Sequence, residues 1–451
     1  MQRNFLFIAA IFLFLEVYIY QAIRTLTDNS WIKLGYCVLS LAVYGFFAYE
    51  VSHFQRSDRS TMRAQIMISL FLVFILPKIF IVIGLLFEDF IRIPTEFYRK
   101  FIFHEISMMQ IIAIISYILF LALAPLSLST KGKISLALLV IVSIYYYKDF
   151  FINERPYLPE RRKFVSLVGL GLGGVLSALF IDGITFGKYR HKVRQVKVKI
   201  KNLPNSFKGY KIIQISDVHS GSFSDPSKLE HAIDLINEQN PDLVLFTGDM
   251  VNNVSEEFKP FIPLFSKIKA KDGKFAVLGN HDYGDYVTWD SPNAKKVNLD
   301  TLIEYEKQAG FDMLMNENRV IDRNGEKLYI LGVENWGLKP FPQFGKIDKA
   351  LENVPQNAAK ILMSHDPTHF DYVVKKHPAD ISLTLSGHTH GMQFGLDLKN
   401  IKWSPVQYRY PKWADLYESE GKLLYVNRGF GVLGYPGRVG VLPEITLLEL
   451  S

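Results

Sequence analysis

The chain has 451 residues, of which 49% are hydrophobic, and its formal net charge is +7. This length allows two or three folding units. The single cysteine, Cys37, excludes an intrachain disulfide and a cysteine-based metal site. The positive charge has neither interleaved aromatic side chains nor a known binding motif, so we expect no nucleic-acid partner.

The apolar residues are concentrated before residue 187. Six runs there are close to the length of about 20 residues that crosses a membrane. These runs are Phe5–Ile23, Ile32–Val51, Ile66–Phe87, Ile106–Leu126, Ile134–Tyr147 and Phe164–Phe186. A soluble domain has no room for so many helices that are apolar on every side. We therefore predict a transmembrane region of five or six helices in residues 1–187, in a multi-pass protein of the inner membrane that contacts lipid.

Two charged residues, Glu16 and Lys78, lie inside these apolar runs. A charge within a membrane is by default a functional candidate, for example in transport. The alternative is that the two side chains reach the membrane surface, or face the interior of the bundle as a pair. We favour this second interpretation.

Two signals disagree about the side of the membrane on which the rest of the chain lies. Arg161–Arg162–Lys163–Phe164 resembles a twin-arginine export signal, which would place the following domain outside the cytoplasm. The basic stretch that begins at Lys188 argues for the cytoplasm by the positive-inside rule. The sequence leaves the side open.

Three further patterns concern local structure. The strict alternation of Val196–Lys201 predicts an edge strand whose lysines prevent mispairing. Ser227–Asn240 is expected to form a helix capped by Ser227, and Leu302–Gly310 a second helix. The aromatic and glycine-rich stretch Tyr283–Pro292 is either an ordinary surface loop or a loop that covers a site.

Five strand-like runs after residue 187 each end in Asp, Asn or His. The residues delivered in this way are Asp217 and His219, Asp249, Asn280 with His281 and Asp282, His365, and His388 and His390. An apolar strand that stops at a polar residue suits a site at the carboxyl end of a sheet. A buried, hydrogen-bonded polar residue explains any one of these runs, but it does not readily explain five.

Ligands of this mixed kind favour transition metals over magnesium or calcium, because imidazole nitrogen suits zinc, iron and similar ions. Two divalent ions about 3.5–4 Å apart clamp a phosphoryl group and activate water as the nucleophile. We expect two divalent metal ions, manganese, zinc or iron, acting on a phosphorylated substrate.

The motif series resembles the calcineurin-like metallophosphoesterase superfamily, and within it the membrane-associated branch that includes the YkuE and YaeI proteins. All five motifs are present in order. The resemblance implies an α/β fold in residues 188–451, a sandwich of two mixed β-sheets flanked by helices, with the metals at the loops beyond the strand ends.

The resemblance also implies roles for individual residues. One metal would be held by Asp217, His219 and His390, the second by Asn280, His365 and His388, and Asp249 would bridge the two. His281 would stabilise charge in the transition state or protonate the leaving oxygen, and Asp282 would orient His281. Met392 stands where many relatives have glycine, which predicts a reshaped pocket.

The part of the chain after residue 400 is rich in aromatic residues and glycine, and it contains Arg428 and Arg438. An arginine can pair with a substrate phosphate in a forked geometry. Equally, each arginine can be the partner of a structural carboxylate. Both interpretations stay open at this point.

We therefore predict a membrane-anchored hydrolase of phosphoester or pyrophosphate bonds. The resemblance extends to hydrolases of UDP-2,3-diacylglucosamine in lipid A biosynthesis, a lipid-linked substrate that needs a cytoplasmic site. The alternatives are a broad phosphodiesterase outside the cytoplasm, a membrane sensor or transporter regulated by the metal domain, and a metal-binding scaffold without catalysis. A scaffold predicts a missing ligand or a lost His281, and every one of these residues is present.

Overall fold

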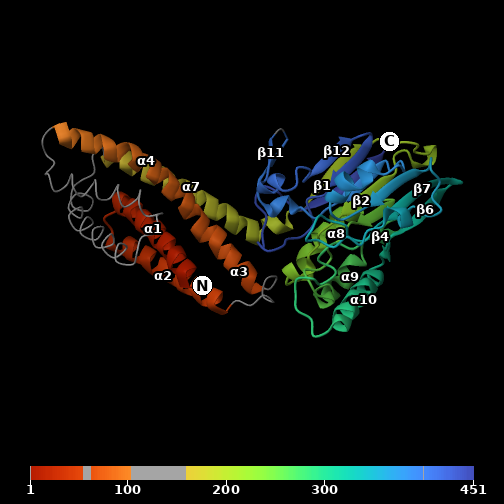
Figure 1. Cartoon of the computed structure of the whole chain (residues 1–451), viewed down its shortest axis with the longest axis horizontal. Helices are drawn as coiled ribbons and strands as arrows, with labels where there is room; N and C mark the ends of the chain where they lie inside the picture. Colours follow the sequence, from red (N-terminus) through yellow and green to blue (C-terminus); the bar gives the residue numbers. More distant parts are fainter. Residues whose placement is uncertain (1, 54–61, 103–158, 400) are drawn as a thin grey trace. The chain divides into compact units, whose positions relative to one another are not determined.

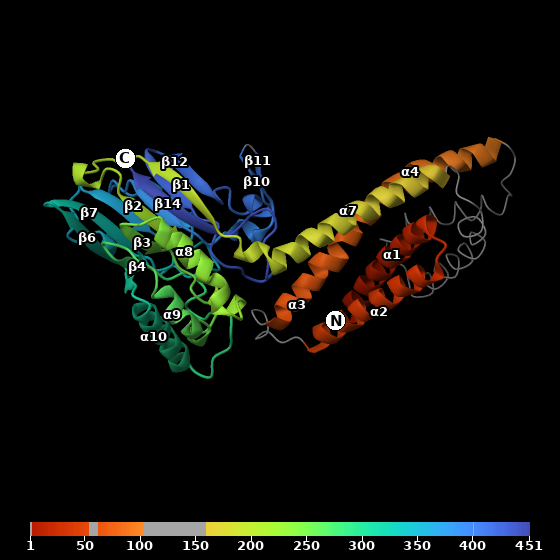
Figure 2. The same ribbon diagram turned by 180° about the vertical axis from the view of Figure 1, so that it is seen from behind.

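The computed structural model describes residues 2–53, 62–102, 159–399 and 401–451. They divide into two compact units (Figures 1 and 2). Residues 1–46 and 74–177 belong to what we name the helical unit, and residues 47–73 and 178–451 to the sandwich unit. Two predicted membrane spans, Ile106–Leu126 and Ile134–Tyr147, lie outside the described residues.

The other four apolar runs are helical. They fall in α1 (Gln2–Leu26), α2 (Ser30–His53), the continuous series α3 (Met62–Leu70), η2 (Phe71–Ile75) and α4 (Leu76–Ile102), and α7 (Pro159–Thr185). Among the residues described, three helical stretches are long and apolar enough to cross a membrane, namely Ser30–His53, Met62–Arg92 and Glu160–Thr185. The expectation of apolar helices before residue 187 is confirmed for these segments.

The two charges within the helical unit bind each other. Lys78 forms an ion pair with Glu16 and is only 5% exposed. The Glu16 carboxylate also accepts hydrogen bonds from the Tyr36 hydroxyl and from Ser40 Oγ, the latter at 2.8 Å. The ammonium group of Lys78 lies 3.6 Å from the centre of the Phe74 ring. Glu16 and Lys78 are therefore an interior pair, as we favoured.

A second ionic cluster explains one of the twin arginines. Nη1 of Arg162 lies 2.8 Å from a carboxylate oxygen of Glu88 and 2.9 Å from one of Asp89. Arg162 is buried, so its charge is neutralised inside the helical unit. It thus has a structural function that is independent of any export signal.

The sandwich unit is built on two six-stranded mixed sheets. The first sheet has the order β1-β14-β2-β3-β4-β5 and the second the order β12-β13-β9-β8-β7-β6. The strands of the first sheet are β1 (Lys192–Val198), β2 (Lys211–Ile215), β3 (Leu243–Phe246), β4 (Lys274–Ala276), β5 (Asp312–Met313) and β14 (Glu444–Leu450). Those of the second are β6 (Glu317–Arg323), β7 (Glu326–Gly332), β8 (Ala359–Met363), β9 (Leu383–Ser386), β12 (Asp415–Ser419) and β13 (Lys422–Val426).

Helices cover the outer faces of both sheets. The first sheet carries α8 (Glu230–Glu238), α9 (Ile262–Phe265) and α10 (Pro292–Gln308), and the second carries α11 (Ile347–Ala350) and α12 (Thr368–Tyr372). Neighbouring residues of β2 enter different layers, since Ile212 belongs to the core between the sheets and Ile213 to the core beneath the helices. Strands buried on both faces read as continuous apolar runs. The predicted helix–sheet–sheet–helix sandwich is confirmed.

The local predictions succeed in outline. The edge strand predicted for Val196–Lys201 is confirmed only in part, because β1 is an edge strand that pairs in parallel with β14 but ends at Val198, before Lys199 and Lys201. The helix expected from Ser227 begins as a short 3-10 turn, and the carboxylate of Asp225, not Ser227, accepts the capping hydrogen bond. The helix expected from Leu302 is the second half of α10, which starts earlier behind the cap residue Ser291.

The Glu16–Lys78 pair makes a testable prediction about stability. Lys78→Met leaves a buried carboxylate without its counter-charge, which costs about 3–5 kcal/mol. Adding Glu16→Gln removes that charge, so the double variant should recover most of the loss. The measurement is thermal unfolding of the full chain in lipid nanodiscs, with Lys33→Met at a partly exposed lysine as the control. Equal losses in the single and double variants would contradict the pairing.

Candidate metal centre

The predicted metal ligands lie at the carboxyl ends of five strands. Asp217 and His219 follow β2, Asp249 follows β3, Asn280 follows β4, His365 follows β8, and His388 and His390 follow β9. β2, β3 and β4 are neighbours in the first sheet, and β8 and β9 are neighbours in the second. The five runs are strands, as predicted, and the fold brings their ends together.

The main chain is unusual at this edge. Five of these residues have a positive φ: Asp217 (+54°), His219 (+48°), Asp249 (+62°), His388 (+71°) and His390 (+52°). Left-handed backbone is uncommon for residues other than glycine. Such conformations cost free energy and persist where the surrounding structure enforces them, most often at functional sites.

The side chains form two clusters. In the first, Nε2 of His390 lies 3.0 Å from Nε2 of His219 and 3.2 Å from Oδ1 of Asp217. In the second, Nε2 of His365 lies 3.3 Å from Nδ1 of His388 and 3.1 Å from Oδ2 of Asp249. In each cluster the three ligand atoms lie within 4.8 Å of one another.

Asp249 connects the clusters. Its Oδ2 atom is 3.1 Å from His365 in the second cluster and 3.6 Å from Nε2 of His219 in the first. Its Oδ1 atom accepts a 2.8 Å hydrogen bond from the backbone N–H of His281. A carboxylate in this position is suited to bridging two cations.

Hydrogen bonds select the ring nitrogens that face the clusters. Nδ1 of His219 donates to the side-chain oxygen of Asn252 at 3.1 Å, and Nδ1 of His365 donates to the carbonyl of Thr247 at 2.8 Å. Nε2 of each ring therefore points toward the clusters, which is the arrangement that metal-binding histidines adopt. Burial and the nearby His390 lower the pKa of His219 well below its usual value, so the ring is in the neutral form that binds a metal.

His281 lies beside the clusters. Its Nδ1 atom donates to the carbonyl oxygen of Asn252 at 2.7 Å, which leaves Nε2 unprotonated in the neutral ring. Its ring lies 4.9 Å from that of His219 and 4.4 Å from that of Tyr286. Tyr286 also accepts a 2.8 Å hydrogen bond from Nδ2 of Asn280. The stretch Tyr283–Pro292 is therefore a loop that contacts the site.

The expected role of Asp282 needs correction. Its carboxylate accepts hydrogen bonds from the backbone N–H groups of Asp249, Met250, Val251 and Gly279 at 2.8–3.3 Å. Asn252, not Asp282, accepts the hydrogen bond that orients His281. Asp282 instead fixes the loop after β3 against the loop after β4, and burial together with Asp249 raises its pKa to about 7.

The two C-terminal arginines are also placed differently from the expected substrate contact. Arg428 is fully buried, and its guanidinium pairs with Asp397 at 3.0 Å, Asp415 at 2.7 Å and Glu444 at 2.8 Å. Arg438 is 1% exposed and donates to main-chain carbonyls, including those of Arg428 at 2.8 Å and Gly431 at 2.9 Å. Arg428 thus has the carboxylate partners of the structural alternative, whereas Arg438 is held by main-chain carbonyls and its Nη2 atom lies 3.5 Å from Nδ1 of His390.

Sequence reasoning missed two contacts of the site. Asn252 binds two of its histidines, one through its side chain and one through its carbonyl group. The Tyr410 hydroxyl lies 2.8 Å from Nε2 of His388. Asn252 follows Asp249 within the same loop. This closeness to a predicted ligand is the one feature of the sequence that could have indicated a role for Asn252 in the site.

The donor set fits divalent cations. Nε2 of His219, Nε2 of His390 and Oδ1 of Asp217 converge within 4.8 Å of one another, a spacing that lets them share one cation. Oδ1 of Asn280 is buried and has no hydrogen-bond partner in the described part of the chain. With the adjacent carboxylates, these atoms provide the nitrogen and oxygen ligands that transition metals prefer.

The bridging position of Asp249 predicts the metal content. Asp249→Asn removes the negative charge that faces both clusters, so both ions should bind more weakly. Metal analysis of the purified full chain by mass spectrometry should show less than full occupancy at both positions. Asp300→Asn, at an exposed aspartate of α10, is the matched control. Full occupancy in the Asp249 variant would refute the bridging role.

Comparison with known proteins agrees with this geometry. The family model "Calcineurin-like phosphoesterase" matches residues 210–392, and the model "Probable Calcineurin-like phosphoesterase, transmembrane domain" matches residues 2–188. Together the two matched segments include every helix of the helical unit and all seven predicted metal ligands.

Three curated relatives are each similar to more than half of this chain. The Bacillus subtilis protein "Uncharacterized metallophosphoesterase YkuE" is 31% identical over 65% of this chain and 98% of its own length. "Phosphodiesterase YaeI" of Escherichia coli is 32% identical over 53% of this chain and 82% of its own length. "Transmembrane protein with metallophosphoesterase domain" of Danio rerio is 27% identical over 61% of each chain. The chain thus belongs to the calcineurin-like phosphoesterase family, and it is a metal-dependent phosphoesterase with a transmembrane domain.

Proposed function

We propose that this enzyme hydrolyses a phosphodiester or pyrophosphate bond in a lipid-linked substrate, and that UDP-2,3-diacylglucosamine is the first substrate to test. The observation that carries the proposal is the pair of ligand clusters that share Asp249, with His281 beside them. The membrane helices support a substrate that is drawn from the bilayer.

Each residue of the site has an assigned task. Asp217, His219 and His390 would hold one metal ion, and His365 and His388 the second together with Asn280, with Asp249 facing both. When bound, the two ions supply Lewis-acid activation of the phosphoryl group and of the attacking water. The Asn252 carbonyl keeps one proton of His281 on Nδ1, so Nε2 is the atom that would take up a second proton from solvent and deliver it to the leaving oxygen.

We place the site on the cytoplasmic side of the membrane. The first support is the basic stretch after α7, in which Lys192, Lys197 and Lys199 are exposed or partly exposed. The second is Arg162, which is part of the run that resembles an export signal. Its ion pairs with Glu88 and Asp89 give this arginine a structural role, so its presence does not by itself argue for export.

A broad phosphodiesterase is the second candidate function, and the name of the relative YaeI favours it. This alternative needs no particular lipid and no cytoplasmic site. A sensor or transporter has weaker support, because Glu16 is already paired with Lys78, and Arg162 with two carboxylates, inside the helical unit.

The role of His281 can be tested without knowing the substrate. His281→Ala should lower kcat on bis-p-nitrophenyl phosphate by about 10²- to 10⁴-fold, the usual contribution of a general acid. Metal content should stay unchanged, because His281 is assigned to neither ion. His231→Ala, at an exposed histidine of α8, is the control. Unchanged turnover in the His281 variant would remove this residue from the mechanism.

The substrate proposal is tested by product analysis. The purified full chain, with and without manganese, is incubated with UDP-2,3-diacylglucosamine, bis-p-nitrophenyl phosphate and p-nitrophenyl phosphate. Manganese-dependent release of UMP from the first compound is the expected result. Cleavage of the two generic esters alone would overturn the lipid A assignment and make the broad phosphodiesterase the leading function.

A further inference from the structure

The hairpin formed by β10 (Leu396–Leu398) and β11 (Ile401–Trp403) turns its apolar face outward. Leu396 pairs with Trp403 and Leu398 with Ile401, so these four side chains share one face of the two-stranded ribbon. They are 51%, 36%, 59% and 56% exposed, respectively. We call this set Leu396, Leu398, Ile401 and Trp403 the hairpin face.

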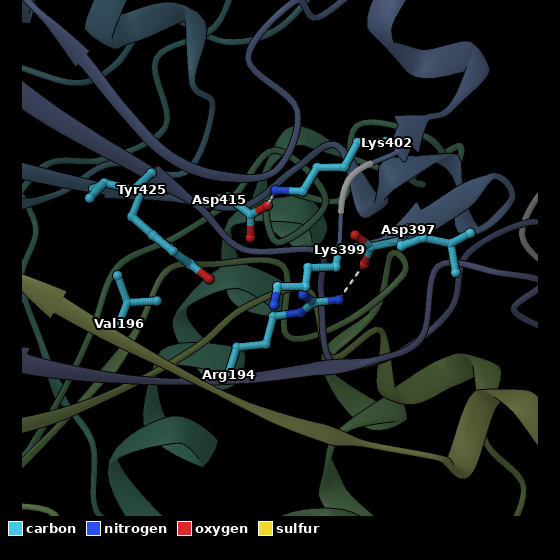
Figure 3. Close-up of a pocket in the computed structure, with 9 residues that line it drawn as sticks. Arg194, Val196, Asp397, Lys399, Lys402, Asp415 and Tyr425 are labelled. Atoms are coloured by element: carbon cyan, nitrogen blue, oxygen red, sulfur yellow. Dashed lines mark hydrogen bonds and ion pairs between the residues drawn. The ribbon is translucent and has the colours of Figure 1, made fainter.

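The opposite face of the ribbon is polar and is held against the sandwich. It carries the cross-strand pair Asp397 and Lys402. Asp397, with a side chain only 3% exposed, forms ion pairs with Arg194 of β1 and with the buried Arg428. Lys402 forms an ion pair with Asp415. Figure 3 shows Arg194, Asp397, Lys402 and Asp415 around a pocket beside the hairpin, which Leu398 and Lys399 also line.

These ion pairs determine which face points outward. Turning the ribbon over would cover the hairpin face, but it would separate Asp397 from two arginines and Lys402 from its aspartate. An outward set of four large apolar side chains on a short ribbon is unfavourable in water and marks an interaction surface. The hairpin face therefore needs an apolar environment.

The end of a membrane-spanning helix lies at the base of the hairpin. Residues 178–185 of α7 belong to the sandwich unit, and they close the candidate span Glu160–Thr185. The ring of Phe180 stacks on Phe394, two residues before β10, with centroids 5.5 Å apart. Phe394 in turn meets the edge of Trp403 at 6.3 Å. The labels of α7, β10 and β11 locate these elements in Figures 1 and 2.

A single loop fastens both elements. The backbone N–H of Arg438 donates to the carbonyl of Gly183 at 3.1 Å, and the N–H of Gly395 donates to the carbonyl of Val439 at 3.0 Å. A side chain at Gly183 would meet the Arg438 carbonyl at 2.8 Å and the Tyr435 hydroxyl at 2.7 Å, so glycine permits this close approach. The helix end and the hairpin are thus held together within the sandwich unit.

A helix that spans the bilayer leaves it at the headgroup level, so the hairpin base is held at that level too. The composition of the region suits this environment. Tryptophan is enriched at membrane interfaces, and lysine at the cytoplasmic surface is attracted to anionic lipid. Lys399, in the turn of the hairpin, is exposed, and so are Leu179 and Ile181 on the last turns of α7.

We propose that the hairpin face enters the interfacial region of the same bilayer that α7 leaves, and that it docks the sandwich unit on the membrane. β10 begins only six residues after His390, and the intervening Met392 is 58% exposed. Docking through this hairpin therefore holds one cluster of the metal centre near the lipid surface. The inference goes beyond the proposed reaction, and its first test needs no substrate.

The first test measures the environment of the hairpin directly. Leu398→Cys, in a Cys37→Ser background, carries an environment-sensitive NBD fluorophore on the full chain in nanodiscs of phosphatidylethanolamine and phosphatidylglycerol. Emission should be blue-shifted and should be quenched by lipids that carry nitroxide at the headgroup or the upper acyl chain. Val320→Cys is the matched control, because Val320 is 44% exposed on β6 at the opposite edge of the second sheet from β12.

Two results would overturn the proposal. A blue shift without nitroxide quenching would mean that protein, either another segment of this chain or a second copy, covers the hairpin face. Emission as in water, equal to that of the Val320 control, would mean that the face is solvated.

A second readout rests on the proposed function and is kept separate from the first. Leu398→Asp should cause a severalfold loss of turnover on a substrate embedded in vesicles, with unchanged turnover on bis-p-nitrophenyl phosphate, whereas Val320→Asp should change neither. Equal turnover of Leu398→Asp and the parent chain on the embedded substrate would contradict a role of docking in access. Quenching in the first test together with no turnover of any lipid substrate would retain the docking and remove the substrate proposal.

Discussion

The fold of the sandwich unit depends on burying seven polar side chains, the predicted metal ligands, at one edge of two packed sheets. Burial of such groups is unfavourable unless each finds a partner. The Nε2 atoms of His219 and His390 lie 3.0 Å apart, and the amide oxygen of Asn280 has no partner in the described structure. The left-handed backbone of five ligand residues adds a further cost. Strand order, loop geometry and the predicted metal binding are therefore parts of one constraint.

The same physics distinguishes charged clusters that are complete from those that need a ligand. Around Arg428, three carboxylates face one guanidinium, and in the helical unit Lys78 balances Glu16. In these clusters donors meet acceptors within the chain. In the metal centre, two carboxylates and four imidazoles converge instead, and the amide oxygen of Asn280 has no partner among the described residues. This convergence of ligand types, more than the number of histidines, is what favours an external cation at this place.

The strand ends could be predicted from the sequence because an apolar run and its terminal ligand are adjacent along the chain. The partners of those ligands could not, because they depend on which strands become neighbours. Asn252 lies 33 positions from His219, and Thr247 lies 118 positions from His365. The role of Arg428 could not be predicted for the same reason. The sequence around an arginine in a glycine-rich loop is the same whether the side chain binds a phosphate or buried carboxylates. The outward apolar face of the β10–β11 hairpin could not be predicted, because an alternating sequence shows that a ribbon has two faces but not which of them points outward.

The position of β14 has a consequence for how the protein is made. β14 lies between β1 and β2, although it follows both by more than half of the chain. A ribosome must therefore pass Leu450 before β1 gains its neighbour and before β2 is covered on that side. During that interval the apolar helices are already available to the membrane, while two strands wait with open edges. The basic residues Lys192, Arg194 and Lys197 of β1 protect such an edge against mispairing, so part of their value is exercised before the native sheet exists.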